Sequence, residues 1–257
     1  MLIFKIFVNR LIKILGHLSK LLCYPFHYFF PKKRFTIPSY AKAIFSSKNP
    51  ARVPRIIWQT NYTDQVSLPV YLNFLFNRLM SPRYEYHHVS TEERVEFVKK
   101  HASEQTFTAY QKLTDGAAQA DLWRLLVLNI RGGVYMDIDA HLVWPLSRLI
   151  NDEEDELYML RREGHYNNYF IATAPNSPIL DRAIAIIVDN IEQKRVDKGV
   201  YHLTGPEVLN TALEGEVVNT LLYRYVCVQG SFTNEHFQYI DKPRGKWTYA
   251  ENDSLLK

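Results

Sequence analysis

Residues 118–139 read AQADLWRLLVLNIRGGVYMDID, and this stretch divides into a helix, a turn and a strand. Residues 117–130 place apolar side chains at helical spacing, and the pair Gly132 and Gly133 ends the helix. These glycines allow the backbone to turn tightly and to approach a ligand closely. Residues 134–138 form a short apolar run, which predicts a buried strand.

Two aspartates, Asp137 and Asp139, stand where this strand ends. Side chains two residues apart on a strand point to the same side, so both carboxylates should meet where the chain leaves the sheet. Ligands of open α/β sheets bind at such carboxyl ends. Adjacent carboxylates repel each other unless a cation joins them, and hard oxygen ligands suit Mg²⁺ or Mn²⁺. Because such metals also bind substrate phosphates, the pair predicts metal-assisted departure of a phosphorylated leaving group.

The preceding helix carries Asp121 and Arg124, which share one face at a spacing of three residues. Such a pair, taken alone, is usually an ion pair on the protein surface. Here it interrupts an otherwise apolar helix close to the two aspartates. If the helix packs beside the strand, Asp121 and Arg124 both reach the metal pocket.

The rest of the chain alternates between strand-like and helix-like segments. Strands are expected at residues 55–58, 84–89, 157–160 and 169–174, and helices at 68–80, 90–100 and 179–193, with another opening at 204–206. This alternation predicts an α/β sandwich with a mostly parallel central sheet.

Composition and charge divide the 257 residues unevenly. Apolar residues make up 47% of the chain, enough for the core of one large domain. Two cysteines form neither a disulfide framework nor a cysteine-rich zinc site. Residues 1–50 hold nine basic residues and no acid, whereas residues 51–257 hold 22 basic and 27 acidic residues. Because the body is mildly acidic, we expect no nucleic acid among its partners.

The first residues predict an amphipathic helix. Wound at 100° per residue, one face carries Phe4, Phe7, Val8, Leu11, Ile14, Leu15, Leu18 and Leu22. The other face carries Lys5, Asn9, Lys13, Gly16, His17 and Lys20. The charges interrupt every apolar stretch before it reaches the ~20 residues that span a bilayer. The pattern favours a helix lying on an anionic membrane surface, and the alternative is a helix packed on the body.

Three segments follow from these patterns. Residues 1–35 form the basic membrane-surface helix with an aromatic and basic segment, residues 36–52 a linker, and residues 53–257 the catalytic domain. The expected location is the cytoplasmic face of a bacterial inner membrane, through peripheral contact.

The segments 120–124 (ADLWR) and 131–139 (RGGVYMDID) resemble the Asp-x-Asp sugar-binding region of glycosyltransferase family 32. That family includes proteins like the yeast initiating α-mannosyltransferase, bacterial capsule and lipopolysaccharide transferases and, more distantly, clostridial glucosylating toxins. Residues 53–60 (VPRIIWQT) are similar to the family's N-terminal strand, and 168–175 and 204–206 add weaker similarity. The resemblance covers roughly residues 53–210.

This resemblance implies a GT-A fold, a nucleotide-sugar donor linked to UDP or GDP, a divalent metal and retention of anomeric configuration. It implies that Asp139 binds the metal directly and that Asp137 holds the ribose or, through water, the metal. Asp121 and Arg124 would hold hydroxyls of the donor sugar. The other donor-binding residues implied are Trp58, Gln59, Gly132, Gly133, Tyr135, Asn168 and Trp247.

The combined prediction is a metal-dependent retaining hexosyltransferase. It would act on a glycan or lipid-linked acceptor in the synthesis of surface polysaccharide, capsule or lipopolysaccharide. Two alternatives remain open. A membrane-associated sugar-binding scaffold would keep the fold without needing paired aspartates, and an Asp-x-Asp phosphatase would leave Asp121 and Arg124 unexplained.

Overall fold

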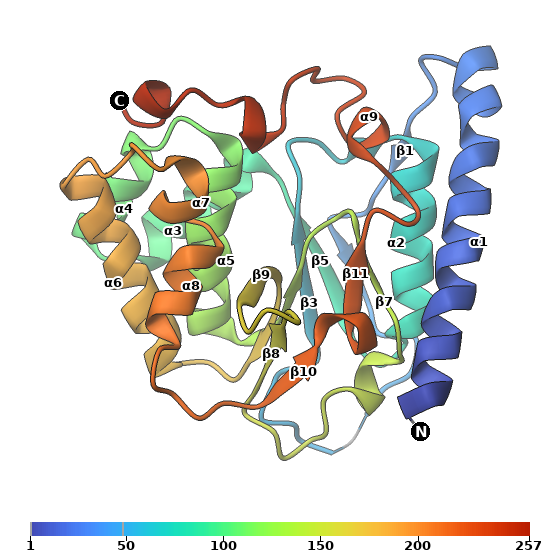
Figure 1. The fold of residues 1–257 in the computed structure, drawn as a ribbon, viewed down its shortest axis with the longest axis horizontal. Helices are drawn as coiled ribbons and strands as arrows, with labels where there is room; N and C mark the ends of the chain where they lie inside the picture. The colour runs from blue at the N-terminus through green and yellow to red at the C-terminus, as the bar shows by residue number, and fades with distance from the viewer. Residues whose placement is uncertain (1, 48) are drawn as a thin grey trace.

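A seven-stranded sheet runs through the middle of the molecule between two helical layers (Figure 1). The computed structural model describes residues 2–47 and 49–257, so Met1 and Lys48, which the predictions include, lie outside the described residues. The strand order is β10-β8-β9-β6-β3-β5-β2. The strands are β2 (Tyr40–Ala41), β3 (Ile56–Thr60), β5 (Glu85–Val89), β6 (Gly133–Met136), β8 (Glu156–Leu160), β9 (Tyr166–Thr173) and β10 (Thr220–Leu222).

Five of these strands run in one direction, and β2 and β9 run in the other. The α/β class and the mostly parallel sheet are therefore confirmed, with the sheet mixed in detail. The reversal at β9 follows from its connection to β8, a short hairpin closed by Arg161 N–H donating to the His165 carbonyl at 2.8 Å. A connection this short joins only antiparallel neighbours.

Helices cover both faces of the sheet, α3–α8 on one side and α2 on the other (Figure 1). They are α2 (Leu68–Met80), α3 (Thr91–His101), α4 (Glu104–Lys112), α5 (Gly116–Arg131), α6 (Pro178–Glu192), α7 (Gly199–Leu203) and α8 (Pro206–Ala212). The helix predicted at 90–100 begins with a capping box, in which the Ser90 hydroxyl accepts from Glu93 N–H and the Glu93 carboxylate accepts from Ser90 N–H.

Two apolar clusters fill the space between the layers. On the α3–α8 side, the fully buried Trp123 of α5 lies among side chains of α6 and α8. On the α2 side, Phe74 packs with Tyr86 and Ile57 of the sheet. Because α5 is buried along most of its length, it is held firmly between the sheet and α6, and its polar residues have fixed positions.

The N-terminal helix α1 (Leu2–Phe29) lies outside α2 at the edge of the molecule (Figure 1). Helix packing on the body, the alternative left open by the sequence, is therefore observed. The buried side, however, includes Asn9 and Gly16 of the predicted polar face together with Ile12 and Cys23, whereas Leu15 of the apolar face is exposed. Among the described residues, no helix has both the length and the hydropathy needed to cross a membrane.

The predicted linker takes part in pairing as well as connecting. β1 (Phe35–Thr36) pairs with β4 (Gln65–Val66) in a separate two-stranded sheet. β2, also from this region, adds an antiparallel edge strand to the central sheet by pairing with β5. The aromatic Tyr40 and the apolar Ala41 lie among the prolines of this region, and these two residues are enough for the edge pairing.

The chain after the central sheet crosses the end of the molecule that carries the strands' carboxyl ends. β11 (Cys227–Gln229) pairs with β7 (Ala140–Leu142). Residues 230–257, here called the C-terminal strap, then run from the α1 side past α9 (Glu235–Gln238) to the α4 side (Figure 1). The 3₁₀ turns are η1 (Leu146–Arg148), η2 (Tyr223–Tyr225), η3 (Trp247–Tyr249) and η4 (Asn252–Ser254).

Candidate active site

The two aspartates lie at the carboxyl end of β6, beyond the last paired residue of the strand. The strand was predicted to run to residue 138, but it ends at Met136. Beyond it the Asp137 N–H donates to the Tyr169 carbonyl at 2.9 Å, and the Ala140 N–H closes a turn onto the Asp137 carbonyl at 3.0 Å. The turn therefore places both carboxylates outside the sheet, where the sequence predicts a ligand site.

A single amide joins the two carboxylates. The Gln229 side-chain Nε2 on β11 lies 3.0 Å from Asp137 Oδ2 and 3.0 Å from Asp139 Oδ1. One oxygen from each aspartate thus converges on one point. This confirms that the two side chains face the same side.

This point suits a divalent cation, because two carboxylate oxygens converge on it and the Gln229 amide can turn to present its oxygen. Among the described residues, no group of three or more His, Cys, Asp or Glu side chains is placed to share a metal. Asp137 and Asp139 would therefore hold the ion with other oxygen donors, such as the amide, water or substrate phosphate. Mn²⁺ and Mg²⁺ both accept such ligands.

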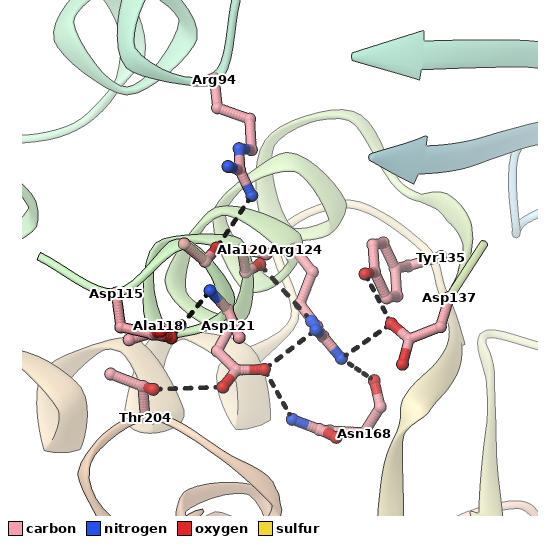
Figure 2. A network of polar contacts seen from close by, with 12 residues as sticks. Arg94, Asp115, Ala118, Ala120, Asp121, Arg124, Tyr135, Asp137, Asn168 and Thr204 are labelled. Carbon is pink, nitrogen blue, oxygen red and sulfur yellow. Dashed lines mark hydrogen bonds and ion pairs between the residues drawn. The ribbon is translucent and has the colours of Figure 1, made fainter. Parts of the chain in front are cut away.

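Arg124 connects helix α5 to Asp137 (Figure 2). Its guanidinium contacts Asp121 Oδ1 at 2.9 Å and Asp137 Oδ1 at 3.4 Å, and it donates to the Asn168 carbonyl at 2.7 Å. The Asn168 amide donates back to Asp121 Oδ1 at 3.0 Å, and the Thr204 hydroxyl donates to Asp121 Oδ2 at 3.1 Å. The network joins α5, β9 and Thr204, the residue after α7, to the end of β6.

Tyr135 completes this network on the strand. Its hydroxyl donates to Asp137 Oδ1 at 2.7 Å, and its ring centre lies 4.4 Å from the Arg124 guanidinium carbon. Ring and guanidinium are therefore close enough for a cation–π contact. Asp137 is held by a hydroxyl, a guanidinium and the Gln229 amide before any ligand binds.

Burial and neighbouring charges together shift the pKa values of the groups in this network. Burial raises the pKa of Asp121 to about 7, while Arg124 opposes the shift. Burial, with the neighbouring Asp137, raises the pKa of Asp139 to about 7. Burial lowers the pKa of the Arg124 guanidinium, but Tyr135 and the neighbouring carboxylates raise it by more. The pKa of Arg124 therefore lies above its usual value. A cation near Asp139 would favour the charged form of this carboxyl group.

A cavity of about 850 Å³ opens above this network. Seven of the predicted site residues line it: Asp121, Arg124, Tyr135, Asp137, Asp139, Asn168 and Trp247. Its volume is within the range of cavities that hold small-molecule ligands. The structure thus brings together the helix pair, the aspartates and the predicted donor-binding Trp247 around one space.

Trp58 and Gln59 lie beneath the site and do not line the cavity. The Trp58 indole N–H donates to the Gly132 carbonyl at 2.9 Å. The Gln59 amide donates to the Asp137 carbonyl at 3.0 Å and accepts from the Tyr86 hydroxyl at 3.0 Å. Through these contacts Trp58 and Gln59 support the backbone of the site. The residues that follow them, Thr60, Asn61 and Tyr62, line the cavity instead.

The glycine pair serves packing within the protein. Gly132 has a φ of 65°, and a Cβ there would lie 2.8 Å from Pro54 and Pro175 side-chain atoms. A Cβ on Gly133 would lie 2.7 Å from the Ile56 carbonyl oxygen. The expected close approach is therefore to neighbouring strands and loops, and neither glycine lines the cavity.

Sequence reasoning missed several lining residues. Gln229 is the last residue of β11, the strand that pairs with β7, and no local motif marks it. Tyr239 and Lys242 come from the C-terminal strap, and Arg94 comes from α3. Lys242 and Arg94 could be found only by knowing that the strap and α3 meet above the sheet.

The comparison with known families identifies the central region. Residues 69–156 match the family described as "Glycosyltransferase sugar-binding region containing DXD motif". The match contains α5, β6 and both aspartates, so this part of the chain is similar to a DXD sugar-binding region.

Two curated proteins show similarity over different lengths. An initiation-specific alpha-1,6-mannosyltransferase of Schizosaccharomyces pombe is 25% identical over 238 residues, covering 80% of this chain and 56% of that protein. A toxin of Photorhabdus asymbiotica is 31% identical over 120 residues, covering 42% of this chain and 4% of the toxin. The chain thus spans little more than half the mannosyltransferase and a small part of the toxin.

The fold is also found in a solved structure. The structure described as PaToxG glycosyltransferase superposes with a TM-score of 0.52 at 21% identity, covering 65% of this chain and 71% of that one. The similarity confirms the predicted GT-A type of fold.

Proposed function

We propose that this protein, whose residues 69–156 match a DXD sugar-binding region, is a retaining glycosyltransferase. It would transfer a hexose from a UDP- or GDP-linked donor to a glycan or glycolipid acceptor in surface polysaccharide or lipopolysaccharide synthesis. The observation that carries the proposal is the convergence of Asp137 and Asp139 on one point beside the Asp121–Arg124 pair. Similarity to a mannosyltransferase supports the transfer of a sugar.

A divalent cation bound by Asp137 and Asp139 would neutralise negative charge on the donor's diphosphate. The chain's own residues would fix the sugar. Asp121 accepts hydrogen bonds and Arg124 donates them, so the pair can hold neighbouring hydroxyl groups on one face of a hexose. Both residues are buried, at most 6% exposed, so their positions are set before the donor arrives.

Basic side chains of the opposite wall would stabilise the departing diphosphate. Lys242 and Lys246 of the C-terminal strap line the cavity, and Lys246 is paired with Glu235 at 3.0 Å. In the proposed transfer, the bond between the anomeric carbon and the phosphate oxygen breaks. The acceptor hydroxyl oxygen bonds to that carbon from the same face, and its proton passes to the departing diphosphate. Positioning and electrostatics supply the acceleration.

The test is calorimetric titration of UDP, GDP and their common sugar conjugates, with and without Mn²⁺. One nucleotide should bind much more tightly with the metal present, and its sugar conjugate should be consumed when an acceptor is added. Binding of neither nucleotide by the folded protein would contradict the proposal and favour a scaffold. Release of phosphate from monoesters would favour a phosphatase.

The variant Asp139→Asn should lose metal-dependent nucleotide binding and transfer, because the amide no longer supplies a charged oxygen. Asp253→Asn changes an exposed aspartate that does not line the cavity, so it is the matched control and should keep both activities. Full transfer activity in Asp139→Asn would remove Asp139 from the metal site.

A further inference from the structure

Helix α1 carries an outward stripe of apolar side chains that the described part of the protein leaves uncovered. The stripe consists of Phe4, Phe7, Leu11, Ile14, Leu15, Leu18 and Leu22, with exposed fractions from 44% at Leu11 to 71% at Leu22. At 100° per residue these positions fall within about a third of the helix circumference. Exposed apolar groups scattered singly are ordinary, whereas a continuous stripe of this length marks an interaction surface.

The opposite face of α1 is fixed to the body by polar contacts. The Asn9 amide donates to the Arg224 carbonyl at 2.7 Å, and the Lys20 ammonium donates to the Gly230 carbonyl at 2.7 Å. Gly16 allows the close approach, since a Cβ there would lie 3.0 Å from Ser231 Cβ.

At the end of the helix, the His27 imidazole accepts from Leu68 N–H at 3.1 Å. Ile12 and Cys23 are buried on the same side, whereas the larger apolar stripe stays exposed, which is unfavourable in water. The contacts therefore hold the helix in an orientation that presents the stripe outward.

Positive charge borders the stripe. Arg10 is exposed beside it, and Lys32 and Lys33 are exposed just after the helix. Between Arg10 and Lys32 in the sequence lie three aromatic residues, Tyr28, Phe29 and Phe30, with exposed fractions of 80%, 71% and 57%. Residues 1–50 contain no acid that could neutralise these charges.

We propose that α1 lies on the surface of an anionic lipid bilayer, with its apolar stripe among the acyl chains and its basic residues at the headgroups. Interfacial helices bind through this combination of a buried apolar face and electrostatic attraction. Aromatic side chains such as Tyr28 and Phe29 suit the boundary layer. Pairing of two α1 helices from separate copies would instead bring Arg10 and its basic neighbours close to like charges. An anionic leaflet, such as the cytoplasmic face of a bacterial inner membrane, offers the complementary charge.

This docking also orients the cavity. Helix α1 contacts the start of the C-terminal strap, where the Tyr24 hydroxyl accepts from the Asn234 amide at 2.8 Å and the Tyr24 ring packs tilted against Phe237. The same strap supplies Tyr239 and Lys242 to the cavity wall. A bilayer that holds α1 would thus hold this wall at a fixed place relative to the membrane. The inference goes beyond the proposed transfer and does not depend on it.

The experiment is cosedimentation of the full chain with vesicles of phosphatidylcholine alone and of phosphatidylcholine mixed with phosphatidylglycerol. We expect binding to the anionic vesicles that weakens as salt screens the charges. Leu15→Ser should reduce partitioning about tenfold, because one leucine side chain no longer enters the bilayer. Val217→Ser, at a fully exposed position between α8 and β10, is the matched control and should bind like the unchanged protein.

Circular dichroism of both variants verifies that the fold is kept, which the exposure of both positions favours. No binding to anionic vesicles would overturn the proposal. An equal loss in Leu15→Ser and Val217→Ser would also overturn it, because the stripe would then have no special part. A soluble dimer that Leu15→Ser dissociates, without vesicle binding, would assign the stripe to a second copy.

Discussion

Gln229, the last residue of the short strand β11, contacts both aspartates of the site. Its single amide nitrogen satisfies one oxygen of Asp137 and one of Asp139. In the absence of a cation, this amide stabilises two carboxylates that would otherwise repel each other. The residue is therefore a sensitive position for testing whether the pair binds a metal.

The substitution Gln229→Glu replaces this amide donor by a third carboxylate. Without metal, we expect the free energy of unfolding to fall by about 2 kcal/mol, since hydrogen bonds to charged groups are lost. With Mn²⁺, the added charge should tighten binding about tenfold, because ligand charge raises the affinity of oxygen sites. Thermal unfolding with Mn²⁺ and with a chelator measures both effects.

Gln238→Glu is the matched control, since Gln238 lines the cavity without contacting the two aspartates through its side chain. It should show the metal response of the unchanged protein. Mn²⁺ could also leave the melting temperatures of both variants and of the unchanged protein as they are. In that case the assignment of Asp137 and Asp139 as metal ligands would be wrong.

His88 makes the stability of the protein depend on pH. Its side chain is 3% exposed, and burial lowers its pKa, while Asp64 and Glu93 oppose the shift. The folded protein thus resists protonation, whereas the unfolded chain accepts a proton below pH ~6.5. Stability should therefore decrease as the pH falls below that value, by up to about 1.4 kcal/mol per unit from this group.

Urea unfolding between neutral and acidic pH measures the slope. His88→Gln should flatten it, and His165→Gln, in the exposed hairpin between β8 and β9, should leave it unchanged. Identical slopes in all three proteins would show that burial of His88 has no part in the acid response.

Helix α1 depends on one glycine for its contact with the body. A Cβ on Gly16 would lie 3.0 Å from Ser231 Cβ and 3.1 Å from the Phe232 ring, a distance that only small adjustments accommodate. Gly16→Leu should push the helix off this surface, and amide hydrogen exchange in α1 should become markedly faster. His17→Leu adds the same side chain at the exposed neighbouring position, so exchange should stay slow.

Retained protection of α1 in Gly16→Leu would mean that contacts further along, such as those of Lys20, are sufficient to hold it. The comparison therefore measures how much of the docking depends on close approach.

Local patterns predicted most elements because each of those elements has a signal of its own. The helix predicted at 68–80 is observed at these bounds, and the capping box at Ser90 begins α3 as expected. The helix–turn–strand of α5 and β6 is confirmed together with the position of the aspartates. Short elements such as β7 and β11 have three residues each, too few for a period to be recognised.

The site was predicted where one segment supplies it and missed where the tertiary structure supplies it. Asp121, Arg124, Asp137 and Asp139 lie within nineteen residues and were all found. Gln229 is 92 residues from Asp137, so only the pairing of β11 with β7 brings it near. Trp58 was placed at the cavity by resemblance, but its indole is committed to the Gly132 carbonyl.

At the scale of the whole molecule, the C-terminal strap spans the cavity and is anchored at both ends. One end is held by α1 through Lys20. At the other end, Leu255 is 1% exposed in the cluster beside α4, and its carbonyl accepts from Thr114 N–H at 3.1 Å. Between these anchors lie the strap residues that line the cavity.

Leu255→Ala should weaken the second anchor. We expect a loss of about 3 kcal/mol in the free energy of unfolding, and faster hydrogen exchange along the strap between α9 and the C-terminus. Leu213→Ala removes the same side chain from the same cluster at a position outside the strap. This control variant should lose a similar free energy of unfolding without faster hydrogen exchange along the strap. Equal exchange along the strap in both variants would contradict the proposal that Leu255 anchors it.

The contact of Lys20 with Gly230 spans 210 residues of chain. A ribosome that has made the DXD region has therefore not yet made the segment that Lys20, Asn9 and Gly16 bind. During synthesis α1 has neither its polar partners nor a covered apolar face, and contacts of such sequence separation form late. The cavity is enclosed only after the strap has been made, so a nascent chain that ends before the strap would possess its aspartates without this wall.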